Sequence, residues 1–304
     1  MGVDFLGLRF ERLGIEHRDR ISAILTRHPQ PLSDYCFSSL FAWALRFDTR
    51  FAIVAPDTLL LTANQEETPT PALLQPVGAF PAPLQDDLLR RARELASPLR
   101  IESVSRAFLD RHQGFAARFE VAEVRASANY VYAAADLAEL PGRRYAGKRN
   151  LIAQASRLTP WSVEPLDPAR LSACLEVRDD IAAGRSAEGG LTHEQETAAL
   201  RRALDHFAAL GLGGLLVRVG GAPAAFSVFD RLSPDTAVVL FERARRDLKG
   251  IYQVVSREAA RMLVARSYAF VNREEDLGDP GLRKAKLSYH PDRLEMKHTL
   301  TLRG

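Results

Sequence analysis

The sequence predicts an α/β (α+β) fold divided into two domains. The chain has 304 residues, which is long for a single hydrophobic core. Its 46% apolar and 26% charged residues are ordinary values for a globular protein. Segments with helical periodicity alternate with segments of strand-like composition in both halves. We therefore expect an N-terminal domain at residues 1–140 and a C-terminal domain at residues 141–304.

The first half shows three segments with apolar residues at helical spacing and three with strand-like composition. The helices are expected at residues 14–28, 35–43 and 84–95, and the strands at residues 51–54, 58–62 and 99–104. Between residues 64 and 83, five prolines interrupt any regular element, so this segment is expected to be an irregular loop. We find no cluster of catalytic residue types in this half.

The second half predicts five helices and four strands. The helices are expected at residues 137–140, 145–158, 168–182, 192–210 and 251–263, and the strands at residues 215–219, 222–229, 237–241 and 268–271. Gly220 and Gly221 separate the first two of these strands, which predicts a hairpin. The helix at residues 145–158 is basic and is expected to join the two domains.

Nothing in the sequence indicates an exported or membrane-spanning protein. Cys36 and Cys174 lie far apart, which predicts free thiols in a reducing compartment. The longest uncharged apolar run, residues 207–217, is shorter than the ~20 residues that span a bilayer. His193 has no second histidine at zinc-site spacing, so no metal is expected. The prediction is a cytoplasmic protein without a secretory signal or a transmembrane segment.

The stretch at residues 268–291 concentrates more polar chemistry than any other part of the chain. If the strand continued past Val271, alternation would place Asn272, Glu274 and Asp276 on one face. Glycines and a proline at residues 277–281 then predict a turn. Basic and aromatic side chains follow it, namely Arg283, Lys284, Lys286, Tyr289 and His290. This pattern predicts a site that binds an anion and moves a proton, with a solvated, salt-bridged loop as the alternative.

The segment NREEDLGDPGLRKAKLSYHP, at residues 272–291, resembles the hallmark of a bacterial protein family. The family is similar to the C-terminal domain of phosphatidylglycerol lysyltransferases. Tyr130-Val131-Tyr132, the basic step ending in Lys148-Arg149-Asn150, and Glu242-Arg243-Ala244 followed by Gly250-Ile251-Tyr252-Gln253 resemble the same family. Two positions depart from it: Asn129, where an acidic residue is more typical, and Arg243, where lysine is more usual.

The resemblance extends from about residue 35 to the end of the chain, and it implies two tandem GNAT-like acyltransferase domains. GNAT is the acyltransferase fold that Fem-type aminoacyltransferases also use. The predicted order of three strands, a glycine turn, a helix and a strand agrees with the acyl-donor half of such a domain. The turn before this helix contains only Gly250, which is unlike the glycine-rich loop that binds acetyl-coenzyme A.

The resemblance also implies transfer of an aminoacyl group from aminoacyl-tRNA to an amine or hydroxyl acceptor. An N-acyltransferase that uses acetyl-coenzyme A and a non-catalytic anion-binding protein of the same fold are the alternatives. Neither co-substrate is expected to stay bound permanently. tRNA and an anionic lipid surface are the candidate macromolecular partners, and the acceptor is a small molecule that the sequence does not identify.

The candidate site residues divide into two groups by the task that the chemistry requires. The carboxylates that can act as base or bind the donor's ammonium group are Glu242, Glu274 and Asp276. The residues expected to bind the donor and its phosphates are Lys148, Arg149, Arg243, Gly250, Ile251, Tyr252, Gln253, Asn272, Arg273, Arg283, Lys284, Lys286 and Tyr289. Within this second group, the backbone amides of Gly250 and Ile251 are expected to polarise the ester carbonyl.

Overall fold

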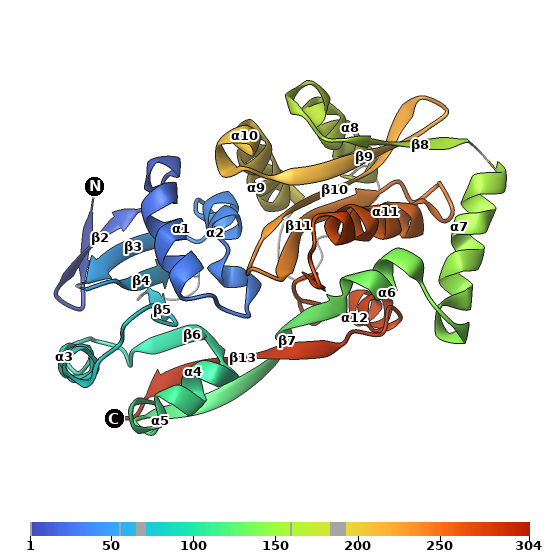
Figure 1. Ribbon diagram of the computed structural model, residues 1–304. Helices are drawn as coiled ribbons and strands as arrows, with labels where there is room; N and C mark the ends of the chain where they lie inside the picture. The colour runs from blue at the N-terminus through green and yellow to red at the C-terminus, as the bar shows by residue number, and fades with distance from the viewer. Residues whose placement is uncertain (1, 55, 65–70, 159, 183–192) are drawn as a thin grey trace. The chain divides into compact units, whose positions relative to one another are not determined.

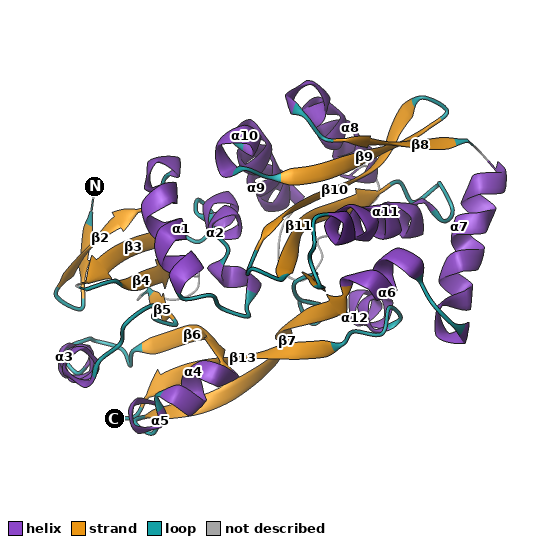
Figure 2. Ribbon diagram, viewed as in Figure 1, coloured by secondary structure: helices purple, strands orange, loops and turns teal. Residues whose placement is uncertain are grey.

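The computed structural model describes residues 2–54, 56–64, 71–158, 160–182 and 193–304. Helices and strands are mixed throughout, which confirms the predicted α/β class (Figures 1 and 2). The chain forms two compact units. Unit 1 consists of Met1–Ala128 with Glu295–Gly304, and unit 2 consists of Asn129–Leu294. This division lies twelve residues before the predicted boundary at 140/141 and assigns the end of the chain to unit 1.

Unit 1 contains a mixed sheet with the strand order β1-β2-β3-β4-β5-β6-β13. Neighbouring strands are antiparallel except β5 and β6, which are parallel. The strands are β1 (Val3–Phe5), β2 (Leu8–Arg12), β3 (Arg50–Val54), β4 (Thr58–Ala63), β5 (Ala72–Leu74), β6 (Arg100–Ser105) and β13 (Arg293–Leu302). The helices are α1 (Arg18–Arg27), α2 (Phe37–Trp43), α3 (Ala82–Ala92), α4 (Arg106–Arg111) and α5 (Gln113–Ala116).

The three helices and three strands predicted in the first half are confirmed, with ends shifted by a few residues. Strand β5 was not predicted, because it lies inside the proline-rich segment. Its three residues are all buried and pair with β4 on one side and β6 on the other. A short buried strand therefore survives where the neighbouring prolines fall outside the paired residues.

Unit 2 contains strands in the order β7-β12-β11-β10-β9-β8. Only β11 and β12 run parallel, and the last residues of β7 pair with β12. The strands are β7 (Phe119–Ala133), which begins in unit 1, β8 (Trp161–Pro165), β9 (Gly213–Val219), β10 (Ala222–Arg231), β11 (Thr236–Ala244) and β12 (Phe270–Asn272). The helices are α6 (Ala134–Glu139), α7 (Ala146–Leu158), α8 (Leu171–Ala182), α9 (His193–Asp205), α10 (Phe207–Leu210), α11 (Ile251–Ala265) and α12 (Pro280–Leu287).

The core of unit 2 lies between its sheet and α11. Helix α11 packs on β9, β10 and β11 and also contacts α6 and α7. Val254, Val255 and Leu263 of α11 are fully buried there, which agrees with the predicted apolar face of this helix. The predicted hairpin between β9 and β10 is confirmed, and its two glycines, Gly220 and Gly221, both have positive φ angles.

One sequence-based expectation about residues 272–291 is wrong. Strand β12 ends at Asn272, and Glu274 and Leu277 have φ angles of 55° and 53°, so the alternation of side chains does not continue. The cations after the predicted turn lie on helix α12, an element that the sequence analysis did not predict. Asp279 caps this helix by accepting a hydrogen bond from the Leu282 amide, and Pro280 occupies its first turn.

Candidate active site

A buried ion pair lies in unit 2, where the segment after β12 meets β11. Arg273 follows β12 directly, and its amide donates a hydrogen bond to the Tyr130 carbonyl at 2.9 Å. Its Nη2 donates to Oε1 of Glu242 on β11 at 2.6 Å, and the two side chains are only 8% and 6% exposed. Burial disfavours the charged form, but the Glu242 carboxylate and the neighbouring tyrosines together outweigh it and raise the pKa of Arg273. Arg273 is therefore a permanent cation below the surface.

Two polar atoms beside this ion pair have no hydrogen-bond partner among the described residues. They are Nη1 of Arg273 and the hydroxyl of Tyr289, a residue that is 4% exposed. The Arg273 guanidinium lies 5.1 Å from the centre of the Tyr289 ring. Leaving a buried donor unpaired costs about 1–3 kcal/mol per group, so native proteins rarely keep such groups without a purpose. Their position next to a buried cation marks this place as a candidate ligand site.

Lys148 adds a second cation next to Tyr289. Its Nζ, on α7, lies 4.0 Å from the centre of the Tyr289 ring and donates a hydrogen bond to Ser288 Oγ at 2.6 Å. Burial and the neighbouring Arg273 charge lower the pKa of Lys148. The Tyr145 hydroxyl donates to the Tyr289 carbonyl at 2.9 Å and so fixes the backbone there. Two cations next to one tyrosine ring create a positive potential that favours an anion or a carbonyl oxygen.

The first turn of α11 borders the ion pair. Burial and the Glu242 carboxylate raise the pKa of Tyr252, a residue that is 37% exposed. The helix begins after Gly250, which has a φ angle of 87°, and a Cβ there would lie 2.2 Å from the Leu151 carbonyl oxygen. Only glycine fits this position. The Ile251 amide, expected to polarise a carbonyl, donates instead to the Leu248 carbonyl at 3.3 Å. Gln253 is half-buried on the same turn.

Asp276 is fully buried, and its carboxylate accepts four hydrogen bonds. Oδ2 accepts from the Tyr130 hydroxyl and Arg283 Nε, both at 2.7 Å. Oδ1 accepts from Arg283 Nη2 at 3.0 Å and from the Gly278 amide at 2.9 Å. Burial opposes the charge, but these bonds outweigh it and hold the pKa of Asp276 well below its usual value. This geometry indicates that Asp276 is a structural carboxylate rather than a catalytic base. Asp276 also binds Arg283, whose charge was expected to bind the aminoacyl donor.

A chain of amide hydrogen bonds supports the segment around Glu274. Asn272 Nδ2 donates to Asn129 Oδ1, and Asn129 Nδ2 donates to Glu275 Oε1, both at 2.9 Å. The Glu274 amide donates to Asn272 Oδ1 at 2.9 Å, which stabilises its unusual positive φ angle. Glu274 is half-buried. Asn129, the position that departs from the family pattern, is thus a fully buried bridge between two other side chains.

Lys286 of α12 reaches the backbone beside Arg273. Its Nζ donates hydrogen bonds to the carbonyls of Arg273 and Glu275 and lies 5.5 Å from the centre of the Tyr130 ring. The Tyr132 hydroxyl donates to the Lys286 carbonyl at 2.9 Å. Burial lowers the pKa of Lys286 to about 8, although the nearby Glu275 carboxylate raises it.

The other predicted cations have different surroundings. Arg149 is exposed and donates to the Leu140 and Gly142 carbonyls, which closes the turn after α6. Arg243 pairs with Glu196 of α9. Lys284 is exposed on α12. The structure therefore brings together five of the predicted site residues, namely Lys148, Glu242, Tyr252, Arg273 and Tyr289.

Sequence reasoning missed the tyrosines that surround these groups. Tyr130 and Tyr132 are fully buried, and their hydroxyls bond Asp276 and the Lys286 carbonyl. The signal was present, since two tyrosines at i and i+2 in an apolar segment face the same side of a strand. A buried tyrosine hydroxyl usually has a hydrogen-bond partner. The two tyrosines therefore indicated that polar groups lie near them.

None of the helices in the described ranges is long and apolar enough to cross a membrane. His, Cys, Asp and Glu side chains nowhere gather as a metal site in the part of the chain that the structure describes.

Comparison with solved structures shows that the fold is shared with other proteins. A conserved protein of unknown function from Bacteroides thetaiotaomicron is 30% identical, with a TM-score of 0.89 over 97% of this chain and 100% of that one. The C-terminal domain of a putative lysylphosphatidylglycerol synthetase from Agrobacterium fabrum is 14% identical, with a TM-score of 0.66 over 95% and 92%. L-PGS from Bacillus licheniformis is 15% identical, with a TM-score of 0.65 over 93% and 91%.

The family comparison agrees with the structural one. The family described as phosphatidylglycerol lysyltransferase, C-terminal, matches residues 26–301. The chain belongs to this family, which confirms the family suspected from residues 272–291. Among curated proteins, no match was found.

Proposed function

We propose that this protein transfers an aminoacyl group from aminoacyl-tRNA to an amine or hydroxyl acceptor. The observation that carries the proposal is the buried Arg273, whose Nη1 lies unpaired in the described structure, as does the neighbouring Tyr289 hydroxyl. Membership of a family of transferase domains supports the reaction class. Both atoms lie below the surface, so the ester of the aminoacyl-tRNA reaches them only when a neighbouring side chain moves. Tyr252 is partly exposed and interacts with Arg273, and it is our candidate for that side chain.

In this reaction the acceptor attacks the ester carbonyl carbon of the donor. The bond from this carbon to the tRNA ribose oxygen breaks, the nucleophile gives its proton to a base, and the ribose oxygen gains a proton as it leaves. Negative charge develops on the carbonyl oxygen, where Arg273 Nη1 and the Tyr289 hydroxyl supply two donors. Their fixed positions mean that little reorganisation is needed as that charge forms.

Glu274 is our candidate for the base. Asp276 accepts four hydrogen bonds from the protein, and Glu242 is paired with Arg273. Glu274 is half-buried and follows Arg273 directly, on a backbone held in place by Asn272. A base must lie within hydrogen-bond reach of the proton that it removes, and we assign this role to Glu274 because it follows the carbonyl-polarising arginine in the chain. Lys148 and the exposed Lys284 then remain for the tRNA phosphates.

The geometry at α11 favours an aminoacyl donor over acetyl-coenzyme A. Coenzyme A binding in this fold uses free amides of a glycine-rich loop before the helix, at its positive end. Here Gly250 is packed against the Leu151 carbonyl, and the Ile251 amide donates to the Leu248 carbonyl. The amides that would hold a pyrophosphate are therefore partly engaged.

The test is a transfer assay with Tyr289→Phe as the variant. tRNA charged with labelled amino acids is incubated with the protein and a panel of amines, alcohols and lipids, and labelled product is counted. The variant removes only an unpaired hydroxyl, so we expect transfer to fall about 100-fold while the free energy of unfolding stays unchanged.

Tyr35→Phe is the matched control. The Tyr35 hydroxyl, in unit 1, donates to the Ser103 carbonyl at 2.9 Å, so its loss should cost about 1 kcal/mol of stability and leave transfer unchanged. Acetylation of amines from acetyl-coenzyme A, with no transfer from charged tRNA, would contradict the proposal. So would ligand binding without any transfer.

A further inference from the structure

Three consecutive carbonyls in the segment that carries Arg273 and Glu274 are hydrogen-bonded. Lys286 Nζ donates to the first and third, those of Arg273 and Glu275. The amide of Tyr130 on β7 donates to the second, that of Glu274, at 3.1 Å. A three-residue stretch outside any strand is thereby fixed at every carbonyl, and two of the three bonds come from one lysine.

The bonded segment needs such support because its backbone is strained. Glu274 has a φ angle of 55°, a region that costs roughly 1–3 kcal/mol for a residue other than glycine. Surrounding contacts must hold such a conformation in place. Lys286 supplies two of them from α12, and the Tyr132 hydroxyl fixes the Lys286 backbone in turn.

The surroundings of Lys286 distinguish it from the cations that meet solvent. Its ammonium faces the Tyr130 ring and the carbonyls of the segment, with the charged side chains of Glu275, Arg273, Glu274 and Asp276 acting on it. Lys284, two residues earlier on the same helix, is exposed. A phosphate of a bound tRNA can meet Lys284 in water, whereas Lys286 Nζ is already turned towards backbone oxygens.

We propose that Lys286 is a positioning residue: it holds the Arg273–Glu275 backbone so that the Arg273 guanidinium and the Glu274 carboxylate are presented to the reacting ester, and it does not bind donor phosphate. The inference rests on the proposed function, because it concerns the same reaction. It replaces the sequence-based expectation that Lys286 is one of three cations for the donor anion.

The experiment compares Lys286→Met with Lys284→Met. Methionine keeps an unbranched apolar stem and removes the ammonium donors. For Lys286→Met we expect the transfer rate at saturating donor to fall roughly 100-fold, as a misplacement of about 1 Å can cause. We expect the dissociation constant for charged tRNA, and its salt dependence, to change little. For Lys284→Met we expect the opposite: a larger dissociation constant for charged tRNA and a shallower salt dependence.

Lys286→Arg and a pH profile complete the activity measurements. Arginine restores donors, and partial recovery of the rate would show that hydrogen bonding rather than size matters. The wild-type profile should show an inflection near pH 8, where Lys286 titrates, and Lys286→Met should lack it. A lower affinity for donor and a shallower salt slope in Lys286→Met, with an unchanged saturated rate, would overturn the proposal and make Lys286 a phosphate ligand.

Amide hydrogen exchange of the free protein tests the same idea without any substrate. Lys286→Met should speed exchange of the amides at residues 273–276 at least tenfold, while Lys284→Met leaves them protected. Unchanged protection in Lys286→Met would overturn the proposal by itself. If wild-type protein transferred nothing from charged tRNA, the proposed function would fail, and faster exchange would still show that Lys286 fixes this segment.

Discussion

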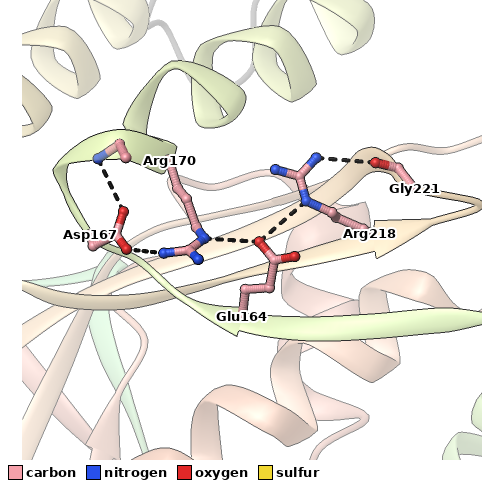
Figure 3. A network of polar contacts seen from close by, with 6 residues as sticks. Glu164, Asp167, Arg170, Arg218 and Gly221 are labelled. Atoms are coloured by element: carbon pink, nitrogen blue, oxygen red, sulfur yellow. Dashed lines mark hydrogen bonds and ion pairs between the residues drawn. The ribbon is translucent and has the colours of Figure 1, made fainter.

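Two regions of unit 2 contain glutamate–arginine ion pairs that differ in burial and in whether every donor has a partner. In the first, which we call the surface network, Oε2 of Glu164 on β8 accepts hydrogen bonds from Arg170 at 3.0 Å and Arg218 at 3.2 Å (Figure 3). Arg218 also donates to the Gly221 carbonyl, and Arg170 pairs with Asp167. These side chains are 26–45% exposed. In the second region, Arg273 meets Glu242 below the surface and keeps Nη1 unpaired within the described structure.

The comparison shows that charge alone does not mark a functional site. In the surface network the arginine groups end on carboxylates or on a backbone carbonyl, and water competes for each bond, so the network contributes little beyond local order. In the buried ion pair, both charges are removed from water, and Arg273 Nη1 has no hydrogen-bond partner among the described residues. Unused hydrogen-bonding capacity in a buried place, rather than the number of charges, separates the candidate site from an ordinary surface.

The largest expected difference concerns stability. Glu242→Ala leaves the Arg273 charge buried and uncompensated, so we expect the free energy of unfolding to fall by about 3–5 kcal/mol. Glu164→Ala removes the centre of the surface network and should be hard to distinguish from wild type in the same urea titration. Equal losses for the two variants would remove the distinction between the regions.

Asp276→Asn should give the next largest effect. We expect a loss of about 2 kcal/mol at neutral pH, because a fully buried carboxylate loses its charge-assisted hydrogen bonds. The folded pKa of Asp276 lies below the ordinary value of 3.8, so its contribution is complete above that pH and is lost as the pH falls further. In acid titrations from pH 5 downward, the variant should therefore lose stability less steeply than wild type. A variant with the wild-type pH dependence would mean that Asp276 does not make this contribution.

The smallest effect is electrostatic and appears only with charged tRNA. Lys148→Ala removes a cation beside Tyr289, so the slope of log Kd against log salt should become shallower by roughly 0.7–0.9. Arg170→Ala, in the surface network, should leave the slope unchanged. Arg283→Ala should also change it little, since Arg283 is engaged by Asp276. If Arg170→Ala and Lys148→Ala lowered the slope equally, tRNA would be bound by diffuse surface charge.

Most helices and strands could be predicted from the sequence, because the spacing of apolar residues that indicates them is a local property of the chain. Helix α11 shows its apolar face in the spacing of Val254, Val255 and Leu263, and packing in the structure uses that face. Helix α12 is absent from the sequence-based prediction because Asp279-Pro280-Gly281 is typical of a turn. The same Asp-Pro pair also begins a helix, and its spacing alone does not decide between the two.

The partners within the site depend on tertiary contacts, which spacing does not reveal. Arg283 and Lys284 are neighbours in sequence, yet Arg283 binds Asp276 and Lys284 is exposed. Positive φ at Glu274 is rare for that residue type, so the end of side-chain alternation was unpredictable. Arg273 and Tyr289 were identified as candidates, but only coordinates show that each keeps a polar atom without a partner.

The position of β13 in unit 1 determines the order in which the two units can be completed during synthesis. Glu295–Gly304 belongs to unit 1, where Lys297 and Leu300 pair with Ser105 and Ile101 of β6. On the ribosome, every residue of unit 2 is synthesised before this strand exists, and domains usually fold in the order of synthesis. Here synthesis of unit 1 begins before that of unit 2, but unit 1 is complete only after unit 2, when residues 295–304 have been made. Until this strand has been synthesised, β6 presents an open edge that other chains can pair with, so a truncation that removes residues 295–304 would damage the first unit rather than the second.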